Sequence, residues 1–182
     1  MSLSFKMLSP YILTMQSSKI IVFMGSRRDF DFASRIKKFL KQESFNVKCE
    51  YIVASAHKTP RRLLEAVSRY EKTGGRFIFI TVAGLSDALS GVVAGSTRYP
   101  VIACPPDSEK YGWAKFFSSA VTPKGIAVAY VPRPENAALA ALKVLAISDE
   151  MLKEKIDNYI QKLKASVVDG STEFVSSEKD ER

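Results

Sequence analysis

Short apolar runs alternate with amphipathic segments along the chain, and this pattern predicts strands and helices in turn. Five runs have the length and continuous apolar character of buried strands. They are residues 19–24, 47–53, 77–83, 100–104 and 126–131. Between the runs, apolar positions recur at helical spacing, as Phe32, Ile36, Phe39 and Leu40 do. The predicted helices cover residues 29–43, 60–73, 86–97, 110–120, 134–146 and 148–165.

The alternation of strands and helices also predicts how the elements assemble. Thr59 and Pro60 open the second helix, because threonine is a good N-cap and proline suits the first helical position. Strands separated by helices imply a mostly parallel sheet that is covered on both faces. Right-handed crossovers then give a three-layer α/β sandwich. The sequence therefore predicts a flavodoxin-like parallel sheet of about five strands.

The length of 182 residues fits a single domain with a sizeable core. We expect this domain to span residues 19–166, after a flexible N-terminal extension at residues 1–18. Residues 167–182 are mostly small and charged, so we expect a disordered tail there.

A formal net charge of +8 suggests an anionic partner. Most basic residues fall on predicted helix faces, and no basic stripe is interleaved with aromatic residues, so we expect no nucleic-acid partner. No apolar run approaches the length of a membrane span, and the first residues lack the pattern of a signal peptide. We therefore expect a cytoplasmic protein that does not bind membranes.

Cys49 and Cys104 lie in apolar, strand-like runs without CxxC spacing. Core thiols in a reducing compartment are the expected state. One histidine and two cysteines leave few ligands for a structural zinc ion, so we expect no metal site.

His57 is the only histidine, and it stands in Ser55-Ala56-His57-Lys58-Thr59-Pro60, between a predicted strand and a predicted helix. The carboxyl ends of strands line the binding crevice of open α/β sheets, and imidazole exchanges protons near neutral pH. Ser55 and Lys58 add a donor and a cation beside it. A lone histidine is usually a surface or structural residue, but its place at a strand end and these neighbours strengthen the case for a chemical role.

Two more segments follow strands at the same predicted edge. Gly25-Ser26-Arg27-Arg28-Asp29 offers backbone N–H groups, a hydroxyl and charges to a phosphate and a ribose, or is a simple helix cap made by Ser26 or Asp29. Small residues at positions 83–91 let a planar ligand approach the backbone, although glycines also serve close helix packing. Together the three segments predict a site for a small phosphorylated molecule.

These segments, with Pro100-Val101-Ile102-Ala103-Cys104-Pro105-Pro106, resemble the motifs of the aminoimidazole ribonucleotide (AIR) carboxylase family of purine biosynthesis, from about residue 19 to about residue 163. One branch of that family carboxylates AIR directly with CO2 to give the C4-carboxylated product, CAIR. The other branch is a mutase that moves a carboxylate from N5 to C4 of the ring. The mutase typically has a second histidine where this chain has Ala88, so the sequence is more similar to the direct carboxylase.

The resemblance implies a role for each predicted site residue. His57 would be the proton shuttle at C4, with Lys58 and Ser86 near the incoming carboxylate or CO2. The other predicted substrate-binding residues are Ser26 and Asp29 at the phosphate and ribose, Ser55 and Gly84 along the ring pocket, and Arg28 as an added phosphate ligand. The substrates would be AIR and CO2, without a cofactor, and the resemblance implies a homo-oligomer, namely an octamer.

The chain departs from the family pattern at three positions. Arg28 stands where the family usually has serine, and Leu85 and Asp87 stand where the carboxylase branch usually has arginine and asparagine. An inward-facing Asp87 carboxylate would repel a bound carboxylate. The alternatives are therefore a mutase, a carboxylase of a different ribonucleotide, and a non-catalytic module that binds a phosphorylated ligand.

Overall fold

The computed structural model describes residues 18–177, and its centre is a five-stranded, fully parallel sheet with the strand order β2-β1-β3-β4-β5. The strands are β1 (Ser18–Met24), β2 (Lys48–Val53), β3 (Arg76–Val82), β4 (Val101–Ala103) and β5 (Ala129–Tyr130). The predicted α/β class and parallel sheet are confirmed. Chain order reverses between β1 and β3, so a binding crevice is expected at their carboxyl ends.

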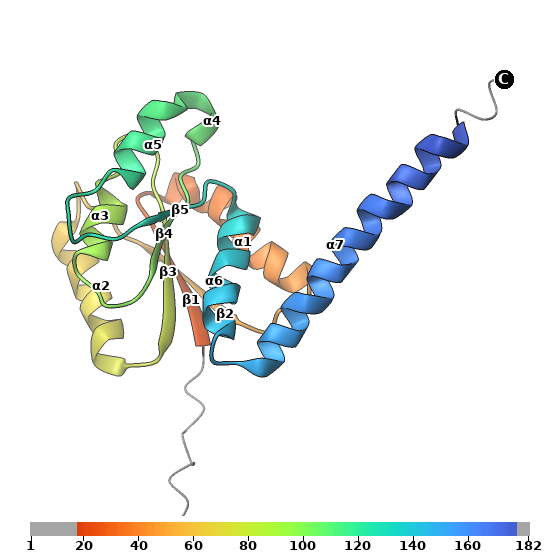
Figure 1. Cartoon of the computed structure of the whole chain (residues 1–182). Helices are drawn as coiled ribbons and strands as arrows, with labels where there is room; N and C mark the ends of the chain where they lie inside the picture. The colour runs from red at the N-terminus through yellow and green to blue at the C-terminus, as the bar shows by residue number, and fades with distance from the viewer. Residues whose placement is uncertain (1–17, 178–182) are drawn as a thin grey trace, which may run out of the picture.

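Helices cover both faces of the sheet, as the three-layer prediction requires (Figure 1). One face carries α1 (Phe30–Gln42), α6 (Pro134–Ala146) and α7 (Glu150–Ser177). The opposite face carries α2 (Pro60–Thr73) and α3 (Ala88–Ala94). The short helices η1 (Arg27–Asp29), α4 (Ser108–Tyr111) and α5 (Trp113–Ala120) lie in the connections that follow β1 and β4.

The central strand β1 is apolar at successive positions because it is buried on both faces. Ile20 and Val22 pack with α1 and α6, whereas Ile21 and Phe23 pack with α2 and α3. All four side chains are fully buried. Neighbouring side chains of a strand point to opposite faces, so a strand between two helix layers needs apolar residues throughout. Burial of each such side chain contributes about 1.5–3 kcal/mol to folding.

A helix, a strand and a helix cap differ from the sequence prediction. Gly112 divides the helix predicted at residues 110–120 into α4 and α5, because its φ of 48° and ψ of −122° interrupt the helical backbone. The strand predicted at residues 126–131 is only the two-residue β5. Thr59 precedes α2 as expected, but its hydroxyl accepts from the Ser55 backbone N–H at 2.9 Å and makes no cap.

The last helix is longer than predicted. It continues past residue 165 to Ser177, whereas the sequence predicts a disordered tail at residues 167–182. Low apolar content removes packing partners, but helical backbone bonds are local and can propagate without them. Residues 178–182, and 1–17 of the predicted extension, lie outside the described range. Within residues 18–177, no helix has the apolar length needed to cross a bilayer.

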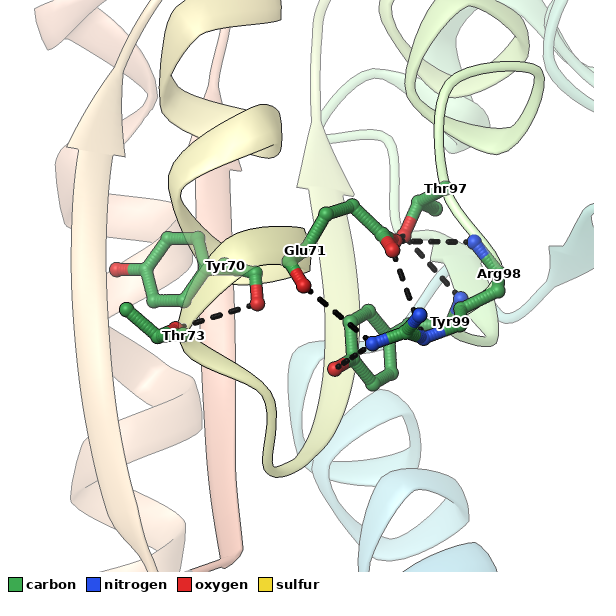
Figure 2. Close-up of polar contacts among 6 residues, drawn as sticks. All are labelled: Tyr70, Glu71, Thr73, Thr97, Arg98 and Tyr99. Atoms are coloured by element: carbon green, nitrogen blue, oxygen red, sulfur yellow. Dashed lines mark hydrogen bonds and ion pairs between the residues drawn. The ribbon is translucent and has the colours of Figure 1, made fainter.

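A cluster of polar contacts ties α2 to the connection before β4, at the amino ends of the strands (Figure 2). The Glu71 carboxylate accepts hydrogen bonds from the Thr97 hydroxyl and, at 3.1 Å, from the Arg98 backbone N–H. The Arg98 guanidinium lies 3.5 Å from that carboxylate and over the Tyr99 ring. Exposed ion pairs contribute only about 0–1 kcal/mol, so the cluster chiefly orients this connection.

Both cysteines are expected to be poorly reactive in the folded protein. Burial raises the pKa of the Cys49 thiol to about 11 and that of Cys104 to about 12. At pH 8, roughly one Cys49 in a thousand is then a thiolate, which is the form that reacts. A chromogenic disulfide reagent should label the native protein slowly and the protein in guanidinium rapidly at both sites. Rapid labelling of both native thiols would show that neither pKa is raised in the folded protein.

Candidate functional site

A cleft of about 590 Å³ opens at the carboxyl ends of β1, β2 and β3. It contains every site residue predicted from the sequence, although these come from three separate segments. Its lining includes Ser26, Arg28, Asp29, Ser55, His57, Lys58, Gly84 and Ser86. The sheet thus brings the three segments together, and the roles of the individual residues stay predictions.

The first segment, between β1 and α1, is organised as a capping box. The Asp29 carboxylate accepts from the Ser26 backbone N–H at 2.8 Å, and the Ser26 hydroxyl accepts from the Arg28 backbone N–H at 3.2 Å. Ser26 and Asp29 thus form a helix cap, which was the alternative to ligand binding, and both residues also line the cleft. Arg28 is exposed, so a cation is available to an anion in the cleft.

The Asp29 carboxyl lies in a mixed electrostatic environment. Burial raises its pKa above the usual value, while the hydrogen bond from the Ser26 N–H lowers it. The nearby charge of Asp107 raises the same pKa and that of Lys115 lowers it. The charges of Asp107 and Lys115, which both come from the connection after β4, therefore act on the Asp29 carboxyl.

The second segment forms a tight turn between β2 and α2. The Ser55 hydroxyl accepts from the Lys58 backbone N–H at 3.2 Å, and the Ser55 carbonyl accepts from the Thr59 backbone N–H at 3.0 Å. The side chains of His57 and Lys58 are exposed at the cleft. The His57 imidazole makes no hydrogen bond to residues 18–168, so the turn presents it to a ligand.

The third segment, after β3, forms the opposite wall. Leu85 adopts a φ of 58°, in the left-handed region that non-glycine residues rarely occupy. Asp87, whose carboxylate would repel a ligand carboxylate if it faced the cleft, is buried and caps α3 instead. It accepts from the Ser90 N–H at 3.1 Å and from the Ser90 hydroxyl at 2.6 Å. Asp87 is not part of the cleft lining.

A buried ion pair beneath this wall was not predicted from the sequence. The Lys115 ammonium, with its side chain 1% exposed, lies 3.3 Å from the Asp107 carboxylate. It donates to the Ala83 and Leu85 carbonyls, both at 2.7 Å. Lys115 is buried although it stands between Trp113 and Phe117, which are exposed, so the usual places of lysine and aromatic residues are inverted. No sequence signal marked this inversion.

A second cleft, of about 520 Å³, lies at the amino end of β1 and is lined by Lys19, Glu50, Arg69 and Tyr70 among others. Its central carboxylate, Glu50, already pairs with Lys19 and accepts from the Tyr70 hydroxyl, both at 2.8 Å. The cleft at the carboxyl ends has exposed charges and an imidazole instead, so it is the stronger candidate. Among the described residues, no group of three or more His, Cys, Asp or Glu side chains is placed to hold a metal ion.

The sheet topology and the cleft define an α/β protein whose candidate ligand site lies at the point where chain order reverses. The family model described as AIR carboxylase matches residues 19–166. The chain belongs to the AIR carboxylase family, and it is therefore an enzyme of that family.

Relatives with two different activities in their names match the chain. A phosphoribosylaminoimidazole carboxylase of Archaeoglobus fulgidus is 44% identical over 78% of this chain and 76% of its own. An N5-carboxyaminoimidazole ribonucleotide mutase of Methanocaldococcus jannaschii is 42% identical over 81% and 92%. The crystal structure of Treponema denticola PurE superposes with a TM-score of 0.80 at 31% identity, over 86% of this chain and 98% of that chain. The family is thus established, and the branch is not fixed by identity.

Gly84 provides a test of how tightly the third wall is packed. A Cβ at Gly84 would lie 3.2 Å from the Asp107 Oδ2, which already accepts from the Leu85 N–H at 2.6 Å. Gly84→Ala should therefore lower the free energy of unfolding by about 1 kcal/mol, as measured by urea titration.

Gly91→Ala is the matched control, because Gly91 lies in α3 and its Cβ would meet only Thr122 at 3.8 Å. This change should raise the free energy of unfolding by about 0.5–1 kcal/mol. Equal effects of the two substitutions would show that the space next to Asp107 is not restrictive.

Proposed function

We propose that the chain is an AIR carboxylase of the direct, CO2-using branch and that His57 carries the proton at C4. The observation that carries this proposal is the solitary imidazole. His57 is the only histidine in the whole sequence, and it lines the cleft beside Lys58. The position at which the mutase branch typically has a second histidine is Ala88, the first residue of α3.

The proposed reaction balances without a cofactor. The enamine-like C4 of AIR attacks the carbon of CO2 and a C–C bond forms. One C=O π bond of CO2 opens in this step, and its electrons go to oxygen, which gives a carboxylate. C4 then carries both the new carboxylate and its original proton. Transfer of that proton to a base restores the ring and gives CAIR. An imidazole can accept the proton in this direction and return it in the reverse direction.

The walls of the cleft suggest an orientation for the substrate. Ser26, Arg28 and Asp29 line the part of the cleft that follows β1, where backbone N–H groups and a cation suit phosphate and ribose. Ser55 and Gly84 would line the ring, between β2 and β3. Lys58 and Ser86 would then lie near the carboxylate, where an exposed ammonium offsets developing negative charge.

The mutase reaction is the second candidate, and the 42% identity to a protein named as a mutase favours it. The two reactions differ in their substrates. Purified protein with AIR and bicarbonate but no ATP should form CAIR, detected by its ultraviolet absorbance. If only N5-carboxy-AIR is converted, the mutase assignment replaces ours. If neither compound reacts, the cleft serves a different ribonucleotide or a non-catalytic ligand.

His57→Asn tests the proton-transfer role. Asparagine preserves much of the shape of the side chain but cannot exchange the proton, so kcat should fall by about 10²–10⁴-fold. AIR affinity, measured by calorimetry, and the urea unfolding midpoint should stay close to those of the wild type because the side chain is exposed. Retained turnover would exclude His57 as the shuttle, and an unfolded variant would instead indicate a structural histidine.

We also propose a homo-oligomer, expected from the family resemblance and supported by aromatic side chains on the outside of α5. Trp113 is 82% exposed and Phe117 is 68% exposed. Exposed apolar surface of this kind often marks a contact between proteins. Light scattering after gel filtration should give a mass several times the 20.2 kDa of one chain. A mass of one chain would contradict the proposal.

A further inference from the structure

The loop between β3 and α3 holds a backbone conformation that its own sequence does not favour. Leu85 has a φ of 58°, and its side chain is 71% exposed, so side-chain packing is not what holds it there. Sparsely populated conformations of this kind persist where the surrounding structure over-determines them, and they cluster at functional sites. The contacts that impose this conformation must therefore act on the backbone.

Those contacts come from the segment that follows β4. The Leu85 N–H donates to the Asp107 carboxylate at 2.6 Å, and the Leu85 carbonyl accepts from the Lys115 ammonium at 2.7 Å. Both backbone groups of the strained residue are thus held by one ion pair. On either side, the Ala83 carbonyl also accepts from Lys115, and the Asp87 N–H donates to the Ser118 hydroxyl at 2.8 Å.

A buried ammonium is costly unless it is paired and hydrogen-bonded. Lys115 meets that condition with two carbonyls and one carboxylate, all of which belong to the loop or to the Asp107 that holds it. Two of its three donors therefore bond the backbone of the loop, and its charge is paired with Asp107. Gly84, Leu85 and Ser86 of this loop line the cleft. Removal of the ion pair would free the loop from its present conformation.

We propose that Lys115, paired with Asp107, is a positioning residue that fixes the Ala83–Asp87 backbone in its reactive geometry. The pair acts from beneath the cleft wall and does not line the cleft. The pair fixes the positions of Ser86 and of the Gly84 backbone relative to the substrate ring and its carboxylate. The segment after β1 holds the phosphate of the substrate. The catalytic readout of this inference rests on the proposed function.

The test removes both charges together, because loss of one partner alone would leave an unpaired buried charge. Asp107→Asn/Lys115→Met should lower kcat for AIR at least about tenfold while KM changes less than about threefold, since the loop meets the reacting end of the substrate. A purely structural role would lower the amount of folded protein without this division between kcat and KM. An unchanged kcat in the folded double variant would overturn the proposal.

Hydrogen–deuterium exchange gives a readout that needs no substrate. Backbone amides of residues 83–89 should exchange at least about tenfold faster in the double variant, while those of β1 keep their protection. Unchanged exchange of residues 83–89 would overturn the proposal. Lys115→Met alone leaves the more exposed Asp107 carboxylate, which still accepts from the Leu85 N–H, and should act in the same direction to a smaller extent, so a double variant that does not fold leaves the test decisive.

Glu71→Gln/Arg98→Met is the matched control, because it neutralises an ion pair at the opposite edge of the sheet (Figure 2). It should leave kcat and the exchange of residues 83–89 unchanged. A wild type that converts neither AIR nor N5-carboxy-AIR would refute the proposed function, while the exchange experiment would still decide the role of Lys115. An active wild type with unaltered loop exchange in the double variant would refute this inference alone.

Discussion

The pairing of β1 with β2 on one side and β3 on the other is the constraint on which the site depends. β1 aligns with β2 from Lys19 to Met24 and with β3 from Ser18 to Met24, always in parallel. Parallel register brings the ends of the three strands to the same edge, so the segments that follow them must meet. The burial of β1 on both faces keeps this register, because a shift by one residue would exchange the environments of Ile20 and Ile21.

The three walls of the cleft are held by different means. The wall after β1 is closed by the capping box of Ser26 and Asp29, and the wall after β2 by the turn from Ser55 to Thr59. Both walls rely on bonds within their own segments. The wall after β3 relies on Asp107, Lys115 and Ser118, which lie more than twenty residues further along the chain. Its geometry therefore requires the tertiary structure, while the other two are largely local.

This division explains how much the sequence could predict. Continuous apolar runs identified β1 and β3, and the bounds of α6 agree with the prediction because proline and the alanine-rich period mark it locally. The residues of the cleft were predictable because each follows a strand directly. The burial of Lys115 was not predictable, because a lysine among aromatic residues is expected to face solvent. The direction of α5 after the break at Gly112 places Lys115 inside. The direction of the Asp87 carboxylate was not predictable either, because it depends on the position of Ser90, from which the carboxylate accepts a hydrogen bond.

The orientation of α5 has a consequence for evolution of the enzyme. One helix of eight residues carries the exposed Trp113 and Phe117 on its outer side and the buried Lys115 between them in sequence. Any change that tilts this helix, including a new contact on its outer side, would displace the ammonium from the carbonyls of Ala83 and Leu85. The outer surface of α5 and the chemistry of the cleft are therefore not free to diverge independently, although no outer residue of the helix lines the cleft.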